Sequence, residues 1–193
     1  MAGFPETGHQ VTDTIVPALR LATERDVAGI TALIDASVRG LGVGYYSDEE
    51  IDESLVTVFG VDSQLIRDQT YLVIDCGGEI AAAGGWSKRS TLYGGDQTKH
   101  EEDAVLDPLV DAARIRAFYV APRWARRGFA RRLYQACEAA ALNAGFHRFQ
   151  LGATLSGVPL YEALGFHALE RTDYTMRFGL TLGIVRMERA IGA

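Results

Sequence analysis

The sequence predicts an α/β fold in which helices cover both sides of a mixed sheet. Its elements follow in the order strand, two helices, three strands, helix, strand, helix, two strands. Interleaving of this kind places helices on both faces of one sheet. A length of 193 residues suits one domain. With 48% apolar and 23% charged residues, the chain has the composition of a globular protein with a sizeable core.

The first part of the chain predicts a strand and two helices. Residues 19–22 are a short apolar run, and Thr23 after them is a suitable helix N-cap. Apolar residues then recur at helical spacing before a glycine-rich loop that carries two tyrosines. Ser47 with Glu50 three residues later has the capping-box pattern, which predicts a second helix through about Val58.

The middle of the chain predicts a hairpin and a long connection. Two apolar runs, 71–75 and 79–86, flank Gly77 and Gly78, and a glycine pair in this place is typical of a tight hairpin turn. Residues 87–111 show no periodicity, so we expect an irregular connection of the kind that is often functional.

The remaining elements centre on one strand–turn–helix unit. Residues 115–120 predict a strand that ends before Pro122. An apolar stripe at three- and four-residue steps over 127–144, ending at Gly145, predicts the longest helix. Strands at 149–153, 166–177 and 182–189 and a short helix at 158–164 complete the set.

Other features limit the class of protein. Residues 1–14 hold no Lys or Arg and no apolar stretch, so we expect a disordered N-terminal tail before a domain over 15–193. No apolar run approaches the roughly 18 residues of a membrane span. Cys76 and Cys137 lie in apolar patterns without metal-ligand spacing, and we expect buried thiols, no metal site and a cytoplasmic location.

The charge of the chain is unevenly distributed. The net charge is −6, yet residues 114–132 hold seven arginines and no acid. A local cationic stretch on an acidic protein favours a small anionic ligand over a nucleic acid, which needs a wider basic face. A solvated helix face is the alternative interpretation.

The arginine-rich stretch coincides with a glycine turn. A strand, a turn and a helix start follow one another from Val120 to Ala130, with Gly128 at the helix start. Backbone N–H groups at a helix N-terminus, next to a residue without a side chain, suit phosphate oxygens. An ordinary strand-to-helix turn is the alternative for this feature taken alone.

Residues 125–130, Ala-Arg-Arg-Gly-Phe-Ala, resemble the (Q/R)xxGx(G/A) motif of the GCN5-related N-acetyltransferase (GNAT) family, which follows a strand ending Val-x-Pro. Ala125 departs from the usual Gln or Arg, so one side-chain contact is missing while the backbone donors remain. The resemblance extends over about 19–189. It implies the acyl-CoA N-acyltransferase fold, with a mixed, mostly antiparallel sheet, and acetyl-CoA as cosubstrate.

The resemblance also implies site residues. Backbone N–H groups from about Arg126 to Arg131 would bind the pyrophosphate of coenzyme A, and arginine side chains the outer phosphates. A backbone N–H near Tyr119 or Val120 would stabilise the developing oxyanion. The expected cofactor-binding residues are Phe118, Tyr119, Val120, Arg126, Arg127, Gly128, Phe129, Ala130 and Arg131.

A second motif strengthens the resemblance. Tyr161, Gly165 and Phe166 match the family's YxxxGF element, whose tyrosine often serves as the general acid toward the departing thiolate. Taken alone, Tyr161 would be interpreted as a packing residue of an amphipathic helix. Together with the glycine turn about thirty residues earlier, it is the candidate catalytic residue.

The general base stays unassigned. Some family members carry a carboxylate four residues before the motif's Val, and here that position is Arg116. Strand alternation predicts Arg116 on the same face as Phe118 and Val120, where its guanidinium would favour an acceptor that bears a carboxylate or phosphate. A salt bridge with one of the many acids is the other interpretation. Glu101, Glu102 and Asp103 are loop carboxylates that could reach the site or simply be solvated.

These observations predict an N-acetyltransferase that acylates a primary amine of a small molecule or peptide by direct attack. The acceptor is unidentified, and a homodimer is an option suggested by the resemblance. A catalytically silent acyl-CoA-binding sensor is the alternative. A nucleic-acid-binding protein is a weaker one, because the chain is acidic and has no aromatic and basic stripe. We expect no nucleic-acid or membrane partner.

Overall fold

The computed structural model describes residues 16–99 and 103–192, so the predicted tail at 1–14 lies outside the described residues.

The described residues form one seven-stranded sheet with the order β1-β2-β3-β4-β5-β7-β6. All neighbouring strands are antiparallel except β4 and β5, which are parallel. The mixed, mostly antiparallel sheet expected from the sequence is confirmed. The strands are β1 (Ala18–Leu21), β2 (Tyr71–Cys76), β3 (Glu79–Ser87), β4 (Ala113–Val120), β5 (Arg148–Thr154), β6 (His167–Thr175) and β7 (Thr181–Ala190).

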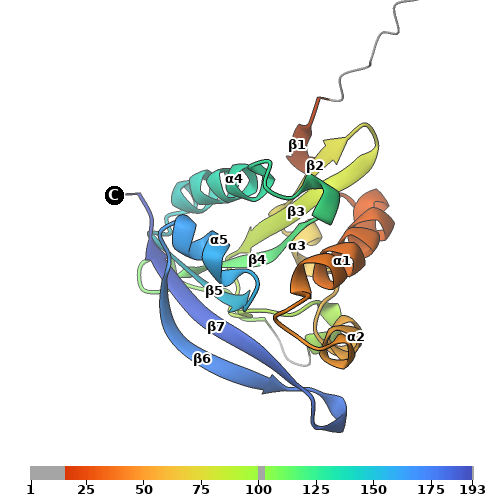
Figure 1. The fold of residues 1–193 in the computed structure, drawn as a ribbon. Helices are drawn as coiled ribbons and strands as arrows, with labels where there is room; N and C mark the ends of the chain where they lie inside the picture. Colours follow the sequence, from red (N-terminus) through yellow and green to blue (C-terminus); the bar gives the residue numbers. More distant parts are fainter. Residues whose placement is uncertain (1–15, 100–102, 193) are drawn as a thin grey trace, which may run out of the picture.

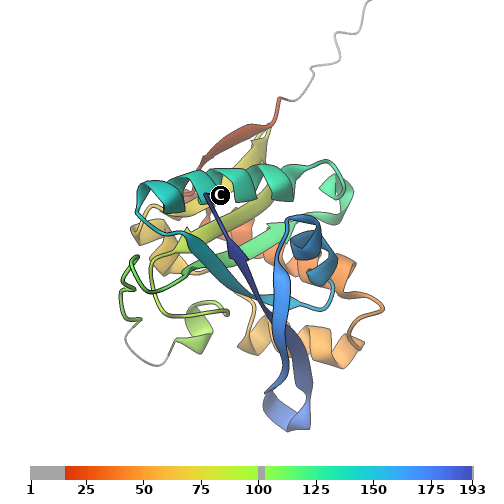
Figure 2. The ribbon, with the colours of Figure 1, turned by 90° about the vertical axis from the view of Figure 1, so that its left-hand side faces the viewer.

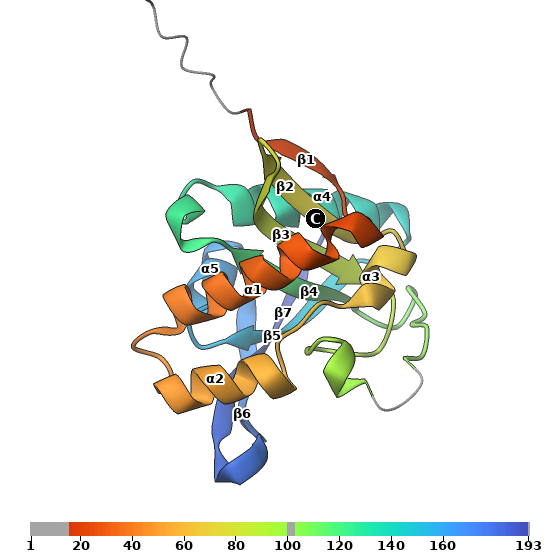
Figure 3. The ribbon, with the colours of Figure 1, turned by 90° about the vertical axis from the view of Figure 1, so that its right-hand side faces the viewer.

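Helices cover both faces of the sheet (Figure 1). One face carries α4 and α5, as Figure 2 shows, and the other carries α1 and α3, as Figure 3 shows. Helix α2 lies beside the β6–β7 hairpin, which projects beyond the rest of the fold. The helices are α1 (Val27–Gly42), α2 (Asp48–Thr57), α3 (Ser63–Arg67), α4 (Phe129–Asn143) and α5 (Val158–Ala163).

Local sequence signals account for the main element boundaries. The Ser47 hydroxyl accepts a hydrogen bond from the Glu50 N–H, and the Glu50 carboxylate accepts one from the Ser47 N–H, so the predicted capping box starts α2. Gly77 and Gly78 both have positive φ angles, as the tight β2–β3 turn requires. Helix α3 was not predicted, because five residues are too few to show helical periodicity.

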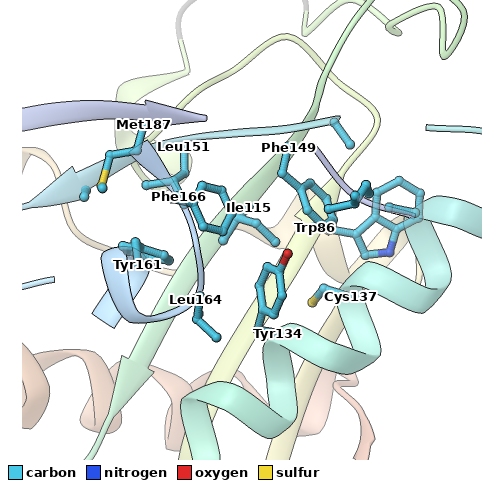
Figure 4. Close-up of a cluster of buried hydrophobic side chains, with 14 of the residues drawn as sticks. Trp86, Ile115, Tyr134, Cys137, Phe149, Leu151, Tyr161, Leu164, Phe166 and Met187 are labelled. Atoms are coloured by element: carbon cyan, nitrogen blue, oxygen red, sulfur yellow. The ribbon is translucent and has the colours of Figure 1, made fainter. Parts of the chain in front are cut away.

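Buried hydrophobic clusters lie on both faces of the sheet. On the α4 side, aromatic and aliphatic side chains from β4, β5 and β7 pack against α4 and α5, as Figure 4 shows. On the α1 side, a second cluster joins α1 and α3 to β2, β3 and the end of β4. Cys76 and Cys137 are buried free thiols, as expected. Across residues 16–99 and 103–192, no helix is both long enough and apolar enough to span a membrane.

Candidate functional site

Strands β4 and β5 separate soon after they start. Their pairing is limited to Ala113 with Phe149 and Arg114 with Gln150. Beyond that point, the edge of β4 that faces β5 has no strand partner among the described residues. The Val120 N–H is instead directed to the Ser37 hydroxyl of α1, at an N–O distance of 3.3 Å. A strand end with unpaired backbone groups can bind an extended ligand through main-chain hydrogen bonds.

A β-bulge at Ala117 decides which β4 side chains face which side of the sheet. Ala117 has a φ of +54°, and the β3–β4 register shifts between Ala83 and Gly85. Arg116 and Tyr119 consequently face the α1 and α3 side, whereas Phe118 lies in the core under α4. The alternation that placed Arg116 on the face of Phe118 and Val120 is wrong, because the bulge adds one residue to the strand.

The position opposite the bulge requires a glycine. A Cβ on Gly84 would lie 2.6 Å from the Phe118 ring, so a larger residue would displace that ring. Phe118 in turn contacts Tyr161, with ring centroids 6.4 Å apart. The bulge, Gly84 and Phe118 thus form one packed unit beside the strand separation.

The predicted glycine turn follows β4 directly. A 3-10 turn, Pro122–Trp124, leads to Arg126 and Gly128, which both have positive φ angles (+62° and +80°). The first N–H groups of a helix have no intrahelical acceptor, and Gly128, the N-cap of α4, has no side chain to accept from them. A Cβ added to Gly128 would meet no atom of the described residues within 4 Å. The helix start is therefore uncrowded at Gly128, and free N–H groups at a helix start suit a phosphate group.

Tryptophan and arginine side chains flank this turn. The Arg127 guanidinium lies over the Trp124 indole at 4.7 Å from the ring centroid, and that indole stacks on Phe129. Arg131 lies close enough to the Ala163 carbonyl, at 3.4 Å, to link the start of α4 to the end of α5. Phe129 itself is 8% exposed, so it would contribute to a ligand through its backbone.

The seven arginines of residues 114–132 do not form one surface patch. Arg114 donates to the Ala112 carbonyl and to Gln150, and Arg116 is buried at 2% exposure. Arg123 is paired with Glu79. The cationic stretch in the sequence thus divides into two strand arginines that are bound within the protein and five arginines in and around the glycine turn. This division favours a compact anion over a polyanion.

Tyr161 lies in α5 on the α4 side of the sheet. Its side chain is largely buried and packs on Phe166, with ring centroids 5.7 Å apart (Figure 4). Its hydroxyl makes no hydrogen bond within residues 16–99 and 103–192. Burial raises the pKa of Tyr161 well above its usual value, so the phenol keeps its proton across the neutral pH range. The structure thus brings Tyr161 and Phe118 together, two residues singled out from the sequence.

The glycine-rich loop between α1 and α2 reaches the other side of the strand separation. Its Tyr46 hydroxyl donates to the Gly183 carbonyl at 2.8 Å and accepts from the Leu155 N–H at 2.7 Å. Phe59, after α2, packs edge-on against Tyr119 with centroids 6.4 Å apart. This loop and the end of α2 therefore border the separated strands opposite α4 and α5.

Of the loop carboxylates considered as general base, the structure describes only Asp103, which is bound within its own loop. Asp103 accepts hydrogen bonds from the Thr91 N–H and the Ser90 hydroxyl, so it organises its own loop. Glu101 and Glu102 lie outside the described residues. Sequence reasoning missed one carboxylate, Asp62, which lies close to Arg116. The only local pattern that pointed to Asp62 was its N-cap position before a short helix.

Comparisons with known proteins agree with this geometry. Residues 106–182 match a family model described as "Acetyltransferase (GNAT) domain". That segment contains the glycine turn, α4, β5, Tyr161 and β6. No curated protein sequence matches the chain significantly.

Solved structures extend the similarity to nearly the whole chain. A GCN5-related N-acetyltransferase from Rhodopseudomonas palustris superposes with a TM-score of 0.64 at 20% identity, covering 95% of this chain and 100% of that one. PaiA N-acetyltransferase from Thermoplasma acidophilum, in complex with coenzyme A, gives 0.63 at 13% identity (91% and 99%). The putative acetyltransferase YncA from Salmonella typhimurium, with its cofactor acetyl-CoA, gives 0.60 at 18% identity (92% and 95%).

The fold similarity covers the chain from β1 to β7, and the sequence similarity covers the segment that holds the glycine turn and Tyr161. The resemblance expected from the two motifs is confirmed: the chain has the GNAT fold, and its residues 106–182 carry the GNAT acetyltransferase domain signature.

Proposed function

We propose that this protein is an N-acetyltransferase that transfers an acetyl group from acetyl-CoA to the primary amine of a small molecule or peptide. The observation that carries the proposal is the juxtaposition of three features at one end of β4. These are the separation from β5 after Arg114, the open N-terminus of α4 at Gly128, and Tyr161 packed against Phe118. The two similar structures that contain coenzyme A or acetyl-CoA support an acyl-CoA donor.

Acetyl-CoA would supply the acetyl group as a thioester, and this chain's residues would bind and orient it. The N–H groups of Phe129, Ala130 and Arg131 at the start of α4 would hold the pyrophosphate, where the helix dipole adds positive potential. Arg126 and Arg127 would contribute charge beside them. Ala125 provides no side-chain donor, so more of the binding depends on the backbone and on neighbouring arginines.

The unpaired edge of β4 would orient the reacting end. A backbone N–H near Tyr119 or Val120 would stabilise negative charge on the carbonyl oxygen. The Val120 N–H currently contacts the Ser37 hydroxyl at 3.3 Å, at the long end of the hydrogen-bond range. A hydroxyl rotates freely about its C–O bond, so Ser37 can release this donor to a better acceptor.

Two proton transfers would accompany the reaction, one from the attacking amine and one to the departing thiolate. An amine with a pKa near 10 is mostly protonated at neutral pH and must lose a proton before it attacks. We assign no side chain to that step. Tyr161, a phenol that is protonated at neutral pH, would donate a proton to the departing thiolate.

The test has two stages. Acetyl-CoA should raise the melting temperature of the protein, whereas adenosine alone should change it little, because adenosine lacks the pyrophosphate. Release of free thiol is then measured against polyamines, aminoglycosides, amino acids and peptide N-termini. Turnover with any amine supports the enzyme. Stabilisation without turnover across the whole library supports the alternative, a silent acyl-CoA-binding sensor, and no stabilisation contradicts both.

A further inference from the structure

A buried ion pair joins β4 to α3. Arg116 Nη2 and Asp62 Oδ2 lie 2.8 Å apart, and each side chain is 1% exposed. Arg116 also donates to the Thr91 carbonyl at 2.9 Å and to the Gly94 carbonyl at 2.6 Å. One guanidinium therefore fastens β4 to the helix that precedes β2 and to the connection between β3 and β4.

The pair is not arranged for the greatest stability. Among residues 16–99 and 103–192, Asp62 Oδ2 finds no well-aligned hydrogen-bond donor despite its short distance to the guanidinium, and the buried Tyr71 hydroxyl finds no partner either. Buried ion pairs with unsatisfied groups are often matched or exceeded in stability by apolar residues of similar volume. We therefore explain the Arg116–Asp62 pair by the backbone geometry that it imposes, and not by a contribution to the free energy of unfolding.

The backbone geometry in question is the β-bulge at Ala117 in β4. Arg116 is the residue directly before Ala117, the bulged position with a φ of +54°. Because the guanidinium is fixed on the α3 side, the chain must make its extra turn at Ala117 before Phe118 enters the α4 side. A strand without the bulge would place Phe118 on the opposite face, away from Tyr161.

We propose that Arg116 and Asp62 are positioning residues for acyl transfer, which hold the Ala117 bulge so that Phe118 and the backbone after it are oriented toward Tyr161. This inference rests on the proposed function. The phosphate-binding turn at Gly128 lies beyond the bulge and is built on α4, so the pair acts on the reacting end of the donor and not on its phosphates. Loss of the pair should lower kcat and leave the affinity for coenzyme A largely unchanged.

The experiment replaces the pair by apolar residues in an Asp62→Leu/Arg116→Met double variant. Lys99, which also binds Asp62, is 16% exposed and can turn to solvent. The matched control is Asp68→Leu/Arg89→Met. That ion pair, 2.7 Å apart and partly buried, also joins α3 to the same connection but does not touch β4.

Three properties are compared with the parent: the melting temperature, the coenzyme A affinity by calorimetry, and kcat at saturating acetyl-CoA. We expect the double variant to fold, to bind coenzyme A within about threefold of the parent, and to lose about tenfold or more in kcat, as misplaced reacting groups do. The control should keep the kcat of the parent. A double variant with the parent's kcat overturns the proposal.

Two further measurements remove ambiguity. If the double variant does not fold, Arg116→Lys is used instead. Lysine keeps the charge but cannot bind two carbonyls and a carboxylate in one plane. An Arg116→Lys protein with the kcat of the parent also overturns the proposal. The nuclear Overhauser effect between the Phe118 and Tyr161 rings tests the bulge without turnover. It should be lost in the apolar double variant and kept in the control, and its retention contradicts the positioning role. Absence of turnover in the parent itself would instead refute the proposed transferase function.

Discussion

The guanidinium of Arg127 stacks on the indole of Trp124, with its central carbon 4.7 Å from the ring centroid. Two further contacts fix the Trp124 indole. Its N–H donates to the Glu79 carboxylate at 3.3 Å, and its ring stacks on Phe129. Arg123, four residues earlier, is bound to Glu79 instead. Two arginines of the same turn therefore have different partners: Arg123 is paired with a carboxylate, whereas Arg127 is stacked on an indole.

Replacing Arg127 by alanine should weaken coenzyme A binding by about tenfold, the value expected for one charge-assisted hydrogen bond. The loss should shrink as salt is raised, because salt screens an exposed charge. Calorimetric titrations at two salt concentrations measure both effects. Arg123→Ala is the control, and an equal loss in that variant would show that general positive charge, not the position of Arg127, matters.

Gly128→Val should weaken coenzyme A binding by about tenfold or more, because a β-branched residue is strained at a φ of +80° and its side chain would occupy the open space before α4. Gly179, at the tip of the β6–β7 hairpin, offers a matched control. It has a φ of +76° and equally open surroundings. Gly179→Val should lower the melting temperature by a similar amount, because the backbone strain is similar. Its affinity for coenzyme A should stay that of the parent. Unchanged affinity in a folded Gly128→Val protein would refute the phosphate site.

Tyr161→Phe should lower kcat by about a hundredfold, the usual contribution of a general acid, and leave acetyl-CoA binding nearly intact. The ring and its contacts with Phe118 and Phe166 are kept. Pre-steady-state measurements ensure that chemistry limits the observed rate. Tyr134→Phe removes another hydroxyl from the same core, one that binds Glu138 and Arg189, and should keep the parental rate. Equal rates for Tyr161→Phe and the parent would make Tyr161 a packing residue.

Asp26→Asn should lower the free energy of unfolding at pH 7 by about 1 to 2 kcal/mol. The Asp26 carboxylate binds the Arg20 guanidinium at 2.8 Å and accepts the Thr23 N–H at 2.7 Å before α1. The hydrogen bonds from Arg20 hold the pKa of Asp26 well below its usual value, against the opposing effect of burial.

A carboxyl whose pKa is lowered by folding contributes fully above its unfolded pKa of about 4 and loses that contribution as the pH falls further. The difference between Asp26→Asn and the parent in urea unfolding should therefore be smaller at pH 3 than at pH 7. Asp35→Asn, which removes an exposed partner of Arg39, should change little at either pH. A constant difference across this pH range would contradict the assignment.

Local patterns were sufficient where one signal determines one element. The glycine pair at 77–78, the Ser47–Glu50 capping box and the apolar stripe of α4 each specified an element that the structure contains. The turn at Gly128 was also predictable, because its backbone geometry depends on a glycine at a helix start.

Tertiary relationships were not predictable in the same way. The bulge at Ala117 belongs to the pairing with β3, and the Arg116 side chain next to it binds Asp62; neither partner is near in sequence. A regular alternation was the only available expectation for β4, and it put Arg116 on the wrong face. The positions of Tyr46 against Leu155 and Gly183 likewise depend on contacts across more than 100 residues.

The last strand of the chain, β7, is not an edge strand but lies between β5 and β6 and pairs with both along its length. During synthesis, β5 and β6 leave the ribosome before the strand that joins them exists. Their unpaired edges and the apolar residues Phe149 and Leu151 are then exposed to the cell, a state that favours aggregation or chaperone binding. The half of the sheet that borders Tyr161 can thus close only after residue 190 has emerged, so acetyltransferase activity would be the last property that the nascent chain acquires.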